Sequence, residues 1–304
     1  MIPRVLIVAG SDSGGGAGIQ ADVRTVTALG GHAMTAITAV TAQNTVAVER
    51  VMPVPADMVV AQIDAVVGDI GVDAVKIGML GSSEVAEAVG GRLGALAGAP
   101  VVLDPVMVAT SGGVLADAGT VAALARLFPL ATLVTPNAPE LARLTGRAVT
   151  DEAGLRAAAR DLAERHGVAV LAKGGHLGGD LLVDLLVTAD GERRWSDARI
   201  DSRHTHGTGC TLASAITVGL AIGDRLDDAI DRARAYVRAA IAAAPGLGRG
   251  HGPLGVPSSS PERGEGQPPQ AGVEGPLPTG IAQRGAPSTT AFAAVPLPVS
   301  GRSL

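Results

Sequence analysis

The sequence predicts an α/β protein with a three-layer α/β/α arrangement around a mostly parallel central sheet. Short apolar runs alternate with helix-length segments along most of the chain, which is the pattern of repeated βαβ units. Polar residues recur just after the predicted strands, at the sheet edge where open α/β folds bind their ligands. These polar positions are Asp12, Gln43, Asp104, Asn137 and Lys173.

The predicted elements of the N-terminal half begin with a strand that is buried on both faces. The apolar run 5–9 is typical of such a strand, and it leads through a glycine-rich loop over 10–16 into a helix over 17–29. The glycine spacing matches neither the dinucleotide fingerprint nor the P-loop, so a Rossmann-type dehydrogenase is disfavoured. The later elements are a strand over 33–40, a helix over 57–67 with Asp57 as its N-cap, a strand over 74–77, a helix over 82–96, a strand over 101–103 and a helix over 117–127.

The C-terminal half continues the alternation and adds an antiparallel pair of strands. The pair is expected over 181–188 and 193–196, around an Asp190-Gly191 turn. The remaining elements are a strand over 132–134, a short helix starting at Glu140, a helix over 151–166, a strand over 168–172, a helix that follows the turn at Gly209, and a helix over 225–243.

Composition excludes several classes of protein. The chain has 304 residues, 47% of them hydrophobic, which is enough for one large domain with a buried core. Its net charge of -5 argues against a general nucleic-acid-binding protein. A single cysteine excludes an internal disulfide framework and suits a reducing cytosol. No export signal is visible, and no apolar run reaches the roughly 20 residues that cross a bilayer, so we expect a cytoplasmic protein without a membrane partner.

The composition changes sharply after Gly250. Ten of the 19 prolines lie beyond this residue, mixed with glycine, serine and glutamine and without helical or strand periodicity. Such a segment cannot bury enough apolar surface to offset the entropy lost on ordering. We therefore expect one folded domain over 1–253 and a Pro/Gly-rich tail over 254–304, disordered from about Pro257 and dispensable for chemistry.

The segment 205–214 combines a glycine-rich turn with the start of an apolar helix. Gly207 and Gly209 interrupt the turn, and the first backbone N–H groups of the helix, including that of Thr208, are left to bind an anion such as a phosphate. Cys210 is the only cysteine and lies at the helix start, where its thiol is expected to have a lowered pKa. The alternatives are an ordinary helix start and a cysteine that is simply a small buried hydrophobic residue.

Three further residues complete a predicted phosphoryl-transfer site. Lys173, one of only two lysines, precedes two glycines at a strand end and is a candidate for binding a phosphate. Asp104 and Glu140 are candidates for holding Mg²⁺ directly or through water, because magnesium prefers carboxylates, phosphates and retained waters. Taken alone, Asp104 is also consistent with a strand-terminating turn, and Glu140 with a charge at a helix N-terminus.

Seven sequence motifs in this order resemble the hydroxymethylpyrimidine/phosphomethylpyrimidine kinases of thiamine biosynthesis, within the ribokinase-like superfamily. The resemblance covers nearly all of the predicted folded domain, over about 5–253. It departs from the family in the first loop, where the usual proline is absent, and in the tail. The motifs are AGSDSGGGAGIQAD at 9–22, TAQNT at 41–45, KIGML at 76–80, DPVM at 104–107, TPNAPE at 135–140, KGGH at 173–176 and HTHGTGCTL at 204–212.

The resemblance implies an ATP-dependent kinase domain that phosphorylates 4-amino-5-hydroxymethyl-2-methylpyrimidine and then its monophosphate. It implies that Cys210 faces the acceptor hydroxyl, as a base or as an orienting group, and that Gln43 recognises the amino group and ring nitrogen of the pyrimidine. An amide suits this role because it offers a donor and an acceptor side by side. The other implied residues are Asp22, Gly10, Met79 and Val106 around the substrate, Gly207, Thr208 and Gly209 in the anion hole, Asn137, Lys173, Thr208 and Gly209 at the nucleotide, and Asp104 and Glu140 at the metal.

Two alternative functions stay open. A pyridoxal or pyridoxine kinase shares the fold, the metal and ATP, although the motifs at 14–22 and 43–45 favour the thiamine pathway. A non-catalytic pyrimidine-binding regulator on the same scaffold is disfavoured by the set of Asp104, Lys173 and Cys210. The family also implies a homodimer, and the loop 108–113 is a candidate lid.

Overall fold

The computed structural model describes residues 2–257, apart from residues 95, 97, 110, 111 and 114. The predicted tail lies outside the described residues from position 258 onward, and the candidate lid over 108–113 is described only in part. In the described part of the chain, no helix has both the length and the apolar character that a membrane span requires.

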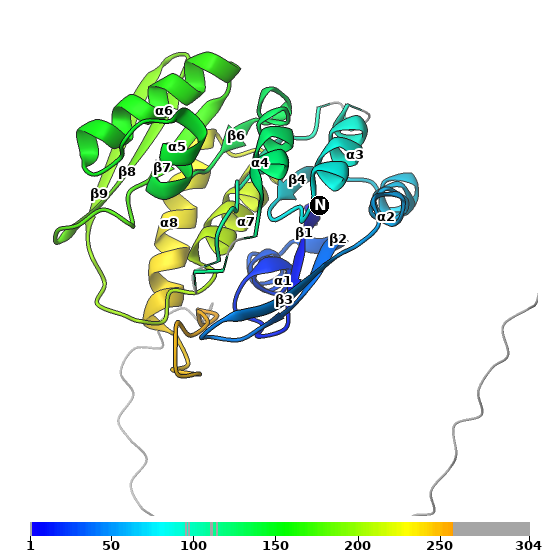
Figure 1. Cartoon of the computed structure of the whole chain (residues 1–304), viewed down its shortest axis with the longest axis horizontal. Helices are drawn as coiled ribbons and strands as arrows, with labels where there is room; N and C mark the ends of the chain where they lie inside the picture. The colour runs from blue at the N-terminus through cyan, green and yellow to red at the C-terminus, as the bar shows by residue number, and fades with distance from the viewer. Residues whose placement is uncertain (1, 95, 97, 110–111, 114, 258–304) are drawn as a thin grey trace, which may run out of the picture. The chain divides into compact units, whose positions relative to one another are not determined.

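A nine-stranded sheet forms the centre of the described domain (Figure 1). Its strands lie in the order β3-β2-β1-β4-β5-β6-β7-β8-β9. The six strands from β2 to β7 in this order pair in parallel, and β3, β8 and β9 pair antiparallel at the two ends. The strands are β1 (Arg4–Asp12), β2 (His32–Gln43), β3 (Val48–Pro53), β4 (Ala74–Ile77), β5 (Val101–Leu103), β6 (Leu133–Val134), β7 (Ala169–Lys173), β8 (Leu181–Thr188) and β9 (Gly191–Ala198).

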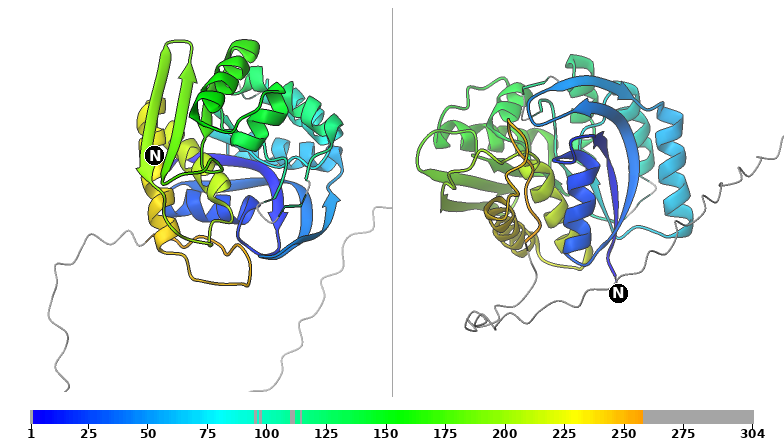
Figure 2. Two further views of the ribbon diagram at one scale, coloured as in Figure 1. Left: turned by 60° about the vertical axis from the view of Figure 1, so that its left-hand side comes forward. Right: turned by 90° about the horizontal axis from the view of Figure 1, so that it is seen from below.

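Helices cover both faces of the sheet, which confirms the predicted three-layer fold (Figure 2). On one face α1, α7 and α8 lie beside one another, and α2 to α6 pack on the other. Each predicted strand and helix is present; β4, β5 and β8 have the predicted bounds, and the ends of the others are shifted. The helices are α1 (Gly18–Ala28), α2 (Ala56–Asp69), α3 (Ser83–Leu93), α4 (Ala118–Ala125), the 3₁₀ turn η1 (Phe128–Leu130), α5 (Ala138–Thr145), α6 (Glu152–His166), α7 (Thr208–Ala221) and α8 (Leu226–Ala242).

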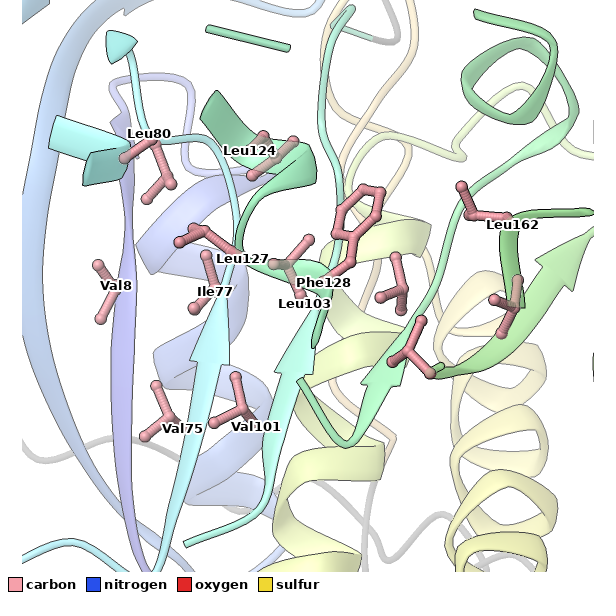
Figure 3. Packing of buried hydrophobic residues seen from close by; sticks show 14 of the residues in the cluster. Val8, Val75, Ile77, Leu80, Val101, Leu103, Leu124, Leu127, Phe128 and Leu162 are labelled. Carbon is pink, nitrogen blue, oxygen red and sulfur yellow. The ribbon is translucent and has the colours of Figure 1, made fainter. Parts of the chain in front are cut away.

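The alternation of side chains along β1 supplies both halves of the core. Leu6 and Val8 belong to the larger apolar cluster, which includes Phe128 and lies between the sheet and α2 to α6 (Figure 3). Val5 and Ile7 point to the opposite face and pack against α1 and α7. Because successive strand residues face opposite sides, an uninterrupted apolar run produces a strand that is buried on both faces.

Short polar side chains begin several helices, as the N-cap rule requires. Ser82, Asp117 and Asp151 each accept a hydrogen bond from a backbone N–H of the helix that follows. The predicted N-cap role of Asp57 is wrong, because α2 begins earlier and Pro55 occupies the N-cap position. Asp57 lies in the first turn, where its negative charge still stabilises the helix N-terminus.

The region after β2 differs most from the sequence prediction. The strand was expected to end at Val40, but it continues to Gln43 and pairs antiparallel with β3, which was not predicted. The register pairs Thr41 with Val51 and Gln43 with Val48, with an irregularity between Ala42 and Gln43. The extension carries Gln43 to the same edge of the sheet as the carboxyl ends of the other parallel strands.

Candidate active site

A cavity of about 1210 Å³ lies at the carboxyl edge of the parallel strands and the N-terminus of α7. Its volume exceeds that of a typical single-ligand pocket, so it has room for two substrates side by side. Twelve of the thirteen predicted site residues line it, and only Asp22 does not. The twelve are Gly10, Gln43, Met79, Asp104, Val106, Asn137, Glu140, Lys173, Gly207, Thr208, Gly209 and Cys210.

The turn before α7 is held in place by a close backbone approach. Gly207 is the N-cap of α7 with a φ of 87°, and a Cβ at this position would lie 2.0 Å from the carbonyl oxygen of Gly16. Only glycine satisfies both conditions. The N–H groups of Gly209 and Cys210 belong to the first helical turn, which has no preceding helical carbonyl to pair with them, and therefore favour a bound anion.

The ionisation of Cys210 differs from the sequence prediction. Burial raises the pKa of its thiol to about 11, and the nearby carboxylates of Asp22 and Asp104 add to this effect against the opposing charge of Lys76. The predicted lowering of the pKa is therefore wrong, since burial and these carboxylates outweigh the helix N-terminus and the lysine. At neutral pH the thiol keeps its proton in the ligand-free cavity.

Asp104 and Lys173 form an ion pair at the floor of the cavity. Lys173 Nζ lies 2.8 Å from Asp104 Oδ1, which also accepts a 2.9 Å hydrogen bond from the Thr135 hydroxyl. A Cβ on Gly209 would lie 3.2 Å from Lys173 Nζ and 3.3 Å from Asp104 Oδ2, so the pair lies directly beside the first turn of α7. Burial opposes ionisation of Asp104, but the charges of Lys173 and Lys76 hold its pKa below the ordinary value.

Asn137 and Glu140 form a reciprocal capping box at the start of α5. The Asn137 side chain accepts from the Glu140 N–H at 2.9 Å, and Glu140 Oε2 accepts from the Asn137 N–H at 2.8 Å. Glu140 therefore stabilises a helix N-terminus, which is one of the two roles considered for it from the sequence. Both residues also line the cavity. Burial raises the pKa of Glu140 to about 7, with Asp104 adding to the effect and Lys173 opposing it.

Lys76 lines the cavity and was not among the predicted site residues. It is fully buried, and its Nζ lies 2.8 Å from Asp22 Oδ2. Asp22 does not itself line the cavity, and its two oxygens accept hydrogen bonds from Lys76 and from the Ser214 hydroxyl. The sequence contained a signal for this pair: a lysine inside a strand buried on both faces needs a buried counter-charge.

A second missed group lies beside Gln43. The imidazole Nε2 of His206 is 2.8 Å from the Gln43 amide nitrogen and 3.0 Å from Asp12 Oδ2. The Asp12 carboxylate also accepts the backbone N–H groups of Gly14, Gly16 and Ala17, so it organises the glycine-rich loop. Burial raises the pKa of Asp12, but these hydrogen bonds and the one from His206 outweigh burial and hold the pKa below its ordinary value.

Charged residues of β8, β9 and α8 form another part of the cavity wall. Arg234 pairs with Asp184 and with Asp197, and Asp184 Oδ1 accepts the N–H of Gly174 at 3.0 Å. Burial lowers the pKa of Arg234 to about 10, which still leaves it charged at neutral pH. The cluster therefore fixes the glycine pair after Lys173 to the antiparallel strands.

The donor set suits a cation that is shared with phosphate groups. Asp104 Oδ2 faces the first turn of α7, and the buried Glu140 carboxylate lines the same cavity. Among the described residues, no three His, Cys, Asp or Glu side chains cluster closely enough to hold a metal by themselves. Two carboxylates together with substrate phosphates and waters are a typical environment for Mg²⁺.

The comparisons with known proteins agree with this geometry. The family model described as phosphomethylpyrimidine kinase matches residues 12–255. The chain belongs to the phosphomethylpyrimidine kinase family. It is therefore a phosphotransferase, and the resemblance inferred from its seven motifs is confirmed.

Two relatives illustrate how much of a phosphomethylpyrimidine kinase the chain spans. A Streptomyces coelicolor protein named hydroxymethylpyrimidine/phosphomethylpyrimidine kinase is 51% identical over 254 residues, covering 83% of this chain and 93% of that protein. A Geobacter sulfurreducens protein named thiamine biosynthesis bifunctional protein ThiED is 53% identical over 251 residues, covering 82% of this chain. The second match covers 51% of the Geobacter protein, so this chain spans about half of that relative's length.

Solved structures of a pyridoxal kinase and of another phosphomethylpyrimidine kinase superpose on this chain. Pyridoxal kinase of Bacillus subtilis, solved as an ADP complex, matches with a TM-score of 0.77 at 33% identity, covering 84% of this chain and 98% of that one. Phosphomethylpyrimidine kinase of Clostridium difficile 630 matches with a TM-score of 0.69 at 37% identity, covering 78% and 98%. The predicted ribokinase-like fold is confirmed.

Proposed function

We propose that the protein transfers the γ-phosphoryl group of ATP to the hydroxymethyl group of 4-amino-5-hydroxymethyl-2-methylpyrimidine. It then transfers a second phosphoryl group to the monophosphate, as a cytoplasmic enzyme of thiamine biosynthesis. The observation that carries the proposal is the single cavity in which Gln43, the α7 N-terminus and the Lys173–Asp104 pair occur together. The relatives' names supply the substrate class.

Each end of the cavity has its own part in the reaction. Gln43, with Gly10, Met79 and Val106 around it, holds the pyrimidine ring. A Cβ on Gly10 would lie 2.3 Å from Met79 Cε, so the absence of a side chain at Gly10 lets the methionine lie across the end of β1. In this position the hydroxymethyl group of the ring points toward Cys210.

The phosphoryl group in transfer lies in front of α7. The backbone N–H groups of Gly209 and Cys210 and the Lys173 ammonium neutralise the charge that spreads over its oxygens, which is most of what a protein contributes to this reaction. Thr208 and Asn137 extend this polar surface toward the nucleotide. Because the Cys210 thiol stays protonated, we propose that it orients the acceptor hydroxyl in line with the transferred group.

Asp104 and Glu140 are the residues that would hold Mg²⁺. When bound, the ion supplies charge neutralisation on the phosphates of ATP. Asp104 keeps its Oδ2 directed at the first turn of α7 because Lys173 and Thr135 occupy Oδ1. The capping box fixes the Glu140 side chain in the same way, with one carboxylate oxygen bound to the Asn137 N–H.

The direct experiment measures ADP release with a small panel of pyrimidine and pyridine alcohols, with and without Mg²⁺. We expect turnover on hydroxymethylpyrimidine and on its monophosphate, with mass spectrometry showing the mono- and diphosphate products. A preference for pyridoxal over the pyrimidine would refute the proposal, and so would binding of the pyrimidine without any release of ADP.

Pyridoxal phosphorylation is the second candidate function. The B. subtilis pyridoxal kinase superposes with a higher TM-score, 0.77, than the 0.69 of the C. difficile phosphomethylpyrimidine kinase. The sequence identity favours the pyrimidine, since it is 33% for the former and 37% for the latter. The same panel separates the two functions through the ratio of kcat/KM for hydroxymethylpyrimidine and pyridoxal.

A homodimer, which the family resemblance implied, is part of the proposal. What supports it is β3, which forms one end of the described sheet and carries the exposed Met52. An edge strand leaves backbone N–H and C=O groups free to pair with another chain. Light scattering on the eluting chromatographic peak gives the mass, and a monomer would contradict this part of the proposal.

A further inference from the structure

His206 is fixed in place from three sides. Its side chain is 94% buried and forms part of the turn that precedes α7. A Cβ on Gly16 would lie 2.3 Å from His206 Cδ2, so the imidazole packs directly on the glycine-rich loop. Its backbone N–H donates to the Gly252 carbonyl at 3.2 Å. The imidazole is therefore buried against the glycine-rich loop, and the backbone that carries it is anchored to the segment after α8.

The Asp12 carboxylate determines which ring nitrogen of His206 carries the proton. Asp12 Oδ2 lies 3.0 Å from His206 Nε2 and already accepts the N–H groups of Gly16 and Ala17. An ionised carboxylate only accepts hydrogen bonds. A lone pair on Nε2 would face the lone pairs of Oδ2, so the stable arrangement has a proton on Nε2.

The proton on Nε2 in turn determines the orientation of the Gln43 amide. The amide lies 2.8 Å from the same Nε2. An amide nitrogen and a protonated ring nitrogen both donate, and two donors cannot share one contact. A half-turn of the amide exchanges its nitrogen and oxygen with almost no change in shape. This half-turn places Oε1 against the imidazole N–H, which Asp12 Oδ2 and Gln43 Oε1 then share as a three-centre hydrogen bond.

We propose that His206, held by Asp12, is a positioning residue that fixes Gln43 with Oε1 toward the imidazole and the amino group toward the cavity. Gln43 then offers two N–H donors and one remaining Oε1 lone pair to the ligand. This pattern selects a ring that presents an acceptor nitrogen beside an amino group. The inference rests on the proposed function and specifies how its site chooses between pyrimidines.

The fixed Gln43 amide distinguishes two ligands of nearly the same shape. A 4-aminopyrimidine presents an acceptor at N3 and a donor at C4, which complements the fixed amide. The 4-oxo analogue presents a donor at N3 and an acceptor at C4, which is the reverse pattern. A site built for one hydrogen-bond pattern rejects the other because buried polar groups are left unpaired.

The test is the ratio of kcat/KM for the 4-amino and 4-oxo hydroxymethylpyrimidines. In His206→Leu the amide is free to turn and to match either ring, so we expect the preference for the amino compound to fall by about tenfold or more. In a Gln43→Ala background, His206→Leu should change the ratio by less than about twofold, because the group it positions is gone.

A control variant and a spectroscopic measurement separate positioning from folding. His204→Leu removes a histidine from the same segment whose hydrogen bonds go to Arg203 and Ser202, and it should leave the ratio unchanged. Long-range ¹⁵N–¹H correlation spectra of the full chain report the His206 tautomer directly. We expect the Nε2–H form, and we expect it to be lost in Asp12→Ala.

Each outcome decides the inference. An Nδ1–H tautomer overturns it, and so does an unchanged ratio in a folded His206→Leu protein. Loss of turnover on both pyrimidines in that variant with an unchanged ratio of binding constants also overturns it. If the natural sequence phosphorylates neither pyrimidine, the proposed function fails, and the tautomer spectrum then decides the positioning role alone.

Discussion

At the scale of single residues, the charges around the cavity decide the ionisation of Cys210. The thiol pKa of about 11 lies above the ordinary value of 9.0 because burial and two carboxylates oppose the thiolate. Thiolate, and not thiol, reacts with alkylating reagents. The rate of alkylation therefore reports this environment, and Cys210 is the only cysteine to which an adduct can belong.

We predict that iodoacetamide modifies Cys210 slowly at neutral pH in the ligand-free protein. The rate should rise about tenfold per pH unit without a plateau up to roughly pH 10, because a thiol with a raised pKa forms its thiolate only at higher pH. Intact-mass spectrometry gives the rate, and N-acetylcysteine in the same buffers is the reference. A plateau near pH 8.5 or below would contradict the raised pKa.

Replacement of Cys210 by alanine separates orientation from binding. We expect kcat to fall by about tenfold to a hundredfold with KM changed by less than about threefold, because aligning the hydroxyl matters mainly in the transition state. Steady-state kinetics on hydroxymethylpyrimidine measures both constants. Cys210→Ser, which keeps a hydrogen-bonding group of similar size, should recover part of kcat. Full turnover in the alanine variant would leave the anion hole as the main contributor.

The buried pair of Lys76 and Asp22 carries the largest stability prediction. Lys76→Met leaves the Asp22 carboxylate buried without its partner, which typically costs about 3–5 kcal/mol. Urea unfolding of the variant should show a midpoint well below that of the natural sequence. Arg126→Met breaks an exposed pair with Glu87 and should leave the midpoint nearly unchanged. Equal midpoints for the two variants would contradict this difference.

Residues that act across long sequence separations were the hardest to infer from the sequence. Asp12 was recognised as a polar residue at a strand end, but its partner His206 lies 194 positions later and carries no local signal beyond its motif. The thiol pKa of Cys210 was misjudged for a related reason. Its position at a helix start is visible in the sequence, whereas the carboxylates behind it come from separate elements.

At the scale of elements, the predictions were most accurate where one periodicity dominates. β4 and β5 have the predicted bounds, because short apolar runs between polar turns leave little choice of register. β3 was missed because its residues are half-buried or exposed along the whole strand. An edge strand with no buried face shows no alternation, so only pairing with β2 reveals it.

The turn that begins α7 gives a prediction at this scale. Gly207→Ala places a Cβ 2.0 Å from the Gly16 carbonyl oxygen, so the turn and the glycine-rich loop cannot keep their present approach. We expect kcat/KM to fall by at least about tenfold, because misplaced donors no longer match the transferred group. Gly223→Ala is the matched control, since Gly223 also has a positive φ of 90° at the far end of α7 but has no atom within 4 Å of its Cβ position.

The two glycine variants isolate one physical cause. Both variants place an alanine in a left-handed backbone conformation, which destabilises the protein by about 1–2 kcal/mol. Only Gly207→Ala adds the contact with the loop. Differential scanning calorimetry and kinetics on both proteins measure the difference, and equal losses of kcat/KM would show that the approach to Gly16 has no role in activity.

At the scale of the whole molecule, the segment after α8 returns to the substrate end of the cavity. The Gly252 carbonyl accepts the His206 N–H, and the His251 N–H donates to the Thr45 carbonyl at 2.9 Å. Leu254 is buried, and the Gly255 N–H donates to Ala240 at the end of α8. These contacts tie residues 251–255 to the folded domain.

Truncation after this segment and truncation before it should have different effects on activity. A chain that ends at Pro257 should keep its turnover, in line with the expectation that the tail is dispensable for chemistry. A chain that ends at Gly248 loses the Gly252 and Leu254 contacts, so we expect a KM for hydroxymethylpyrimidine raised by about tenfold, since one buried hydrogen bond and one buried leucine are lost. Steady-state kinetics on both proteins tests this. Lost activity in the longer chain would contradict the expectation for the tail.

The hydrogen bond between His206 and Gly252 also has a consequence for the time course of synthesis. Gln43 is synthesised before its partner His206, which follows 163 residues later. Gly252, whose carbonyl accepts the His206 N–H, is synthesised after both. A nascent chain that ends before Gly252 lacks the backbone contact that supports His206. Ligand binding at the supported site therefore requires that Gly252 has been synthesised, and a bound pyrimidine reports that β2 and the segment after α8 have come together.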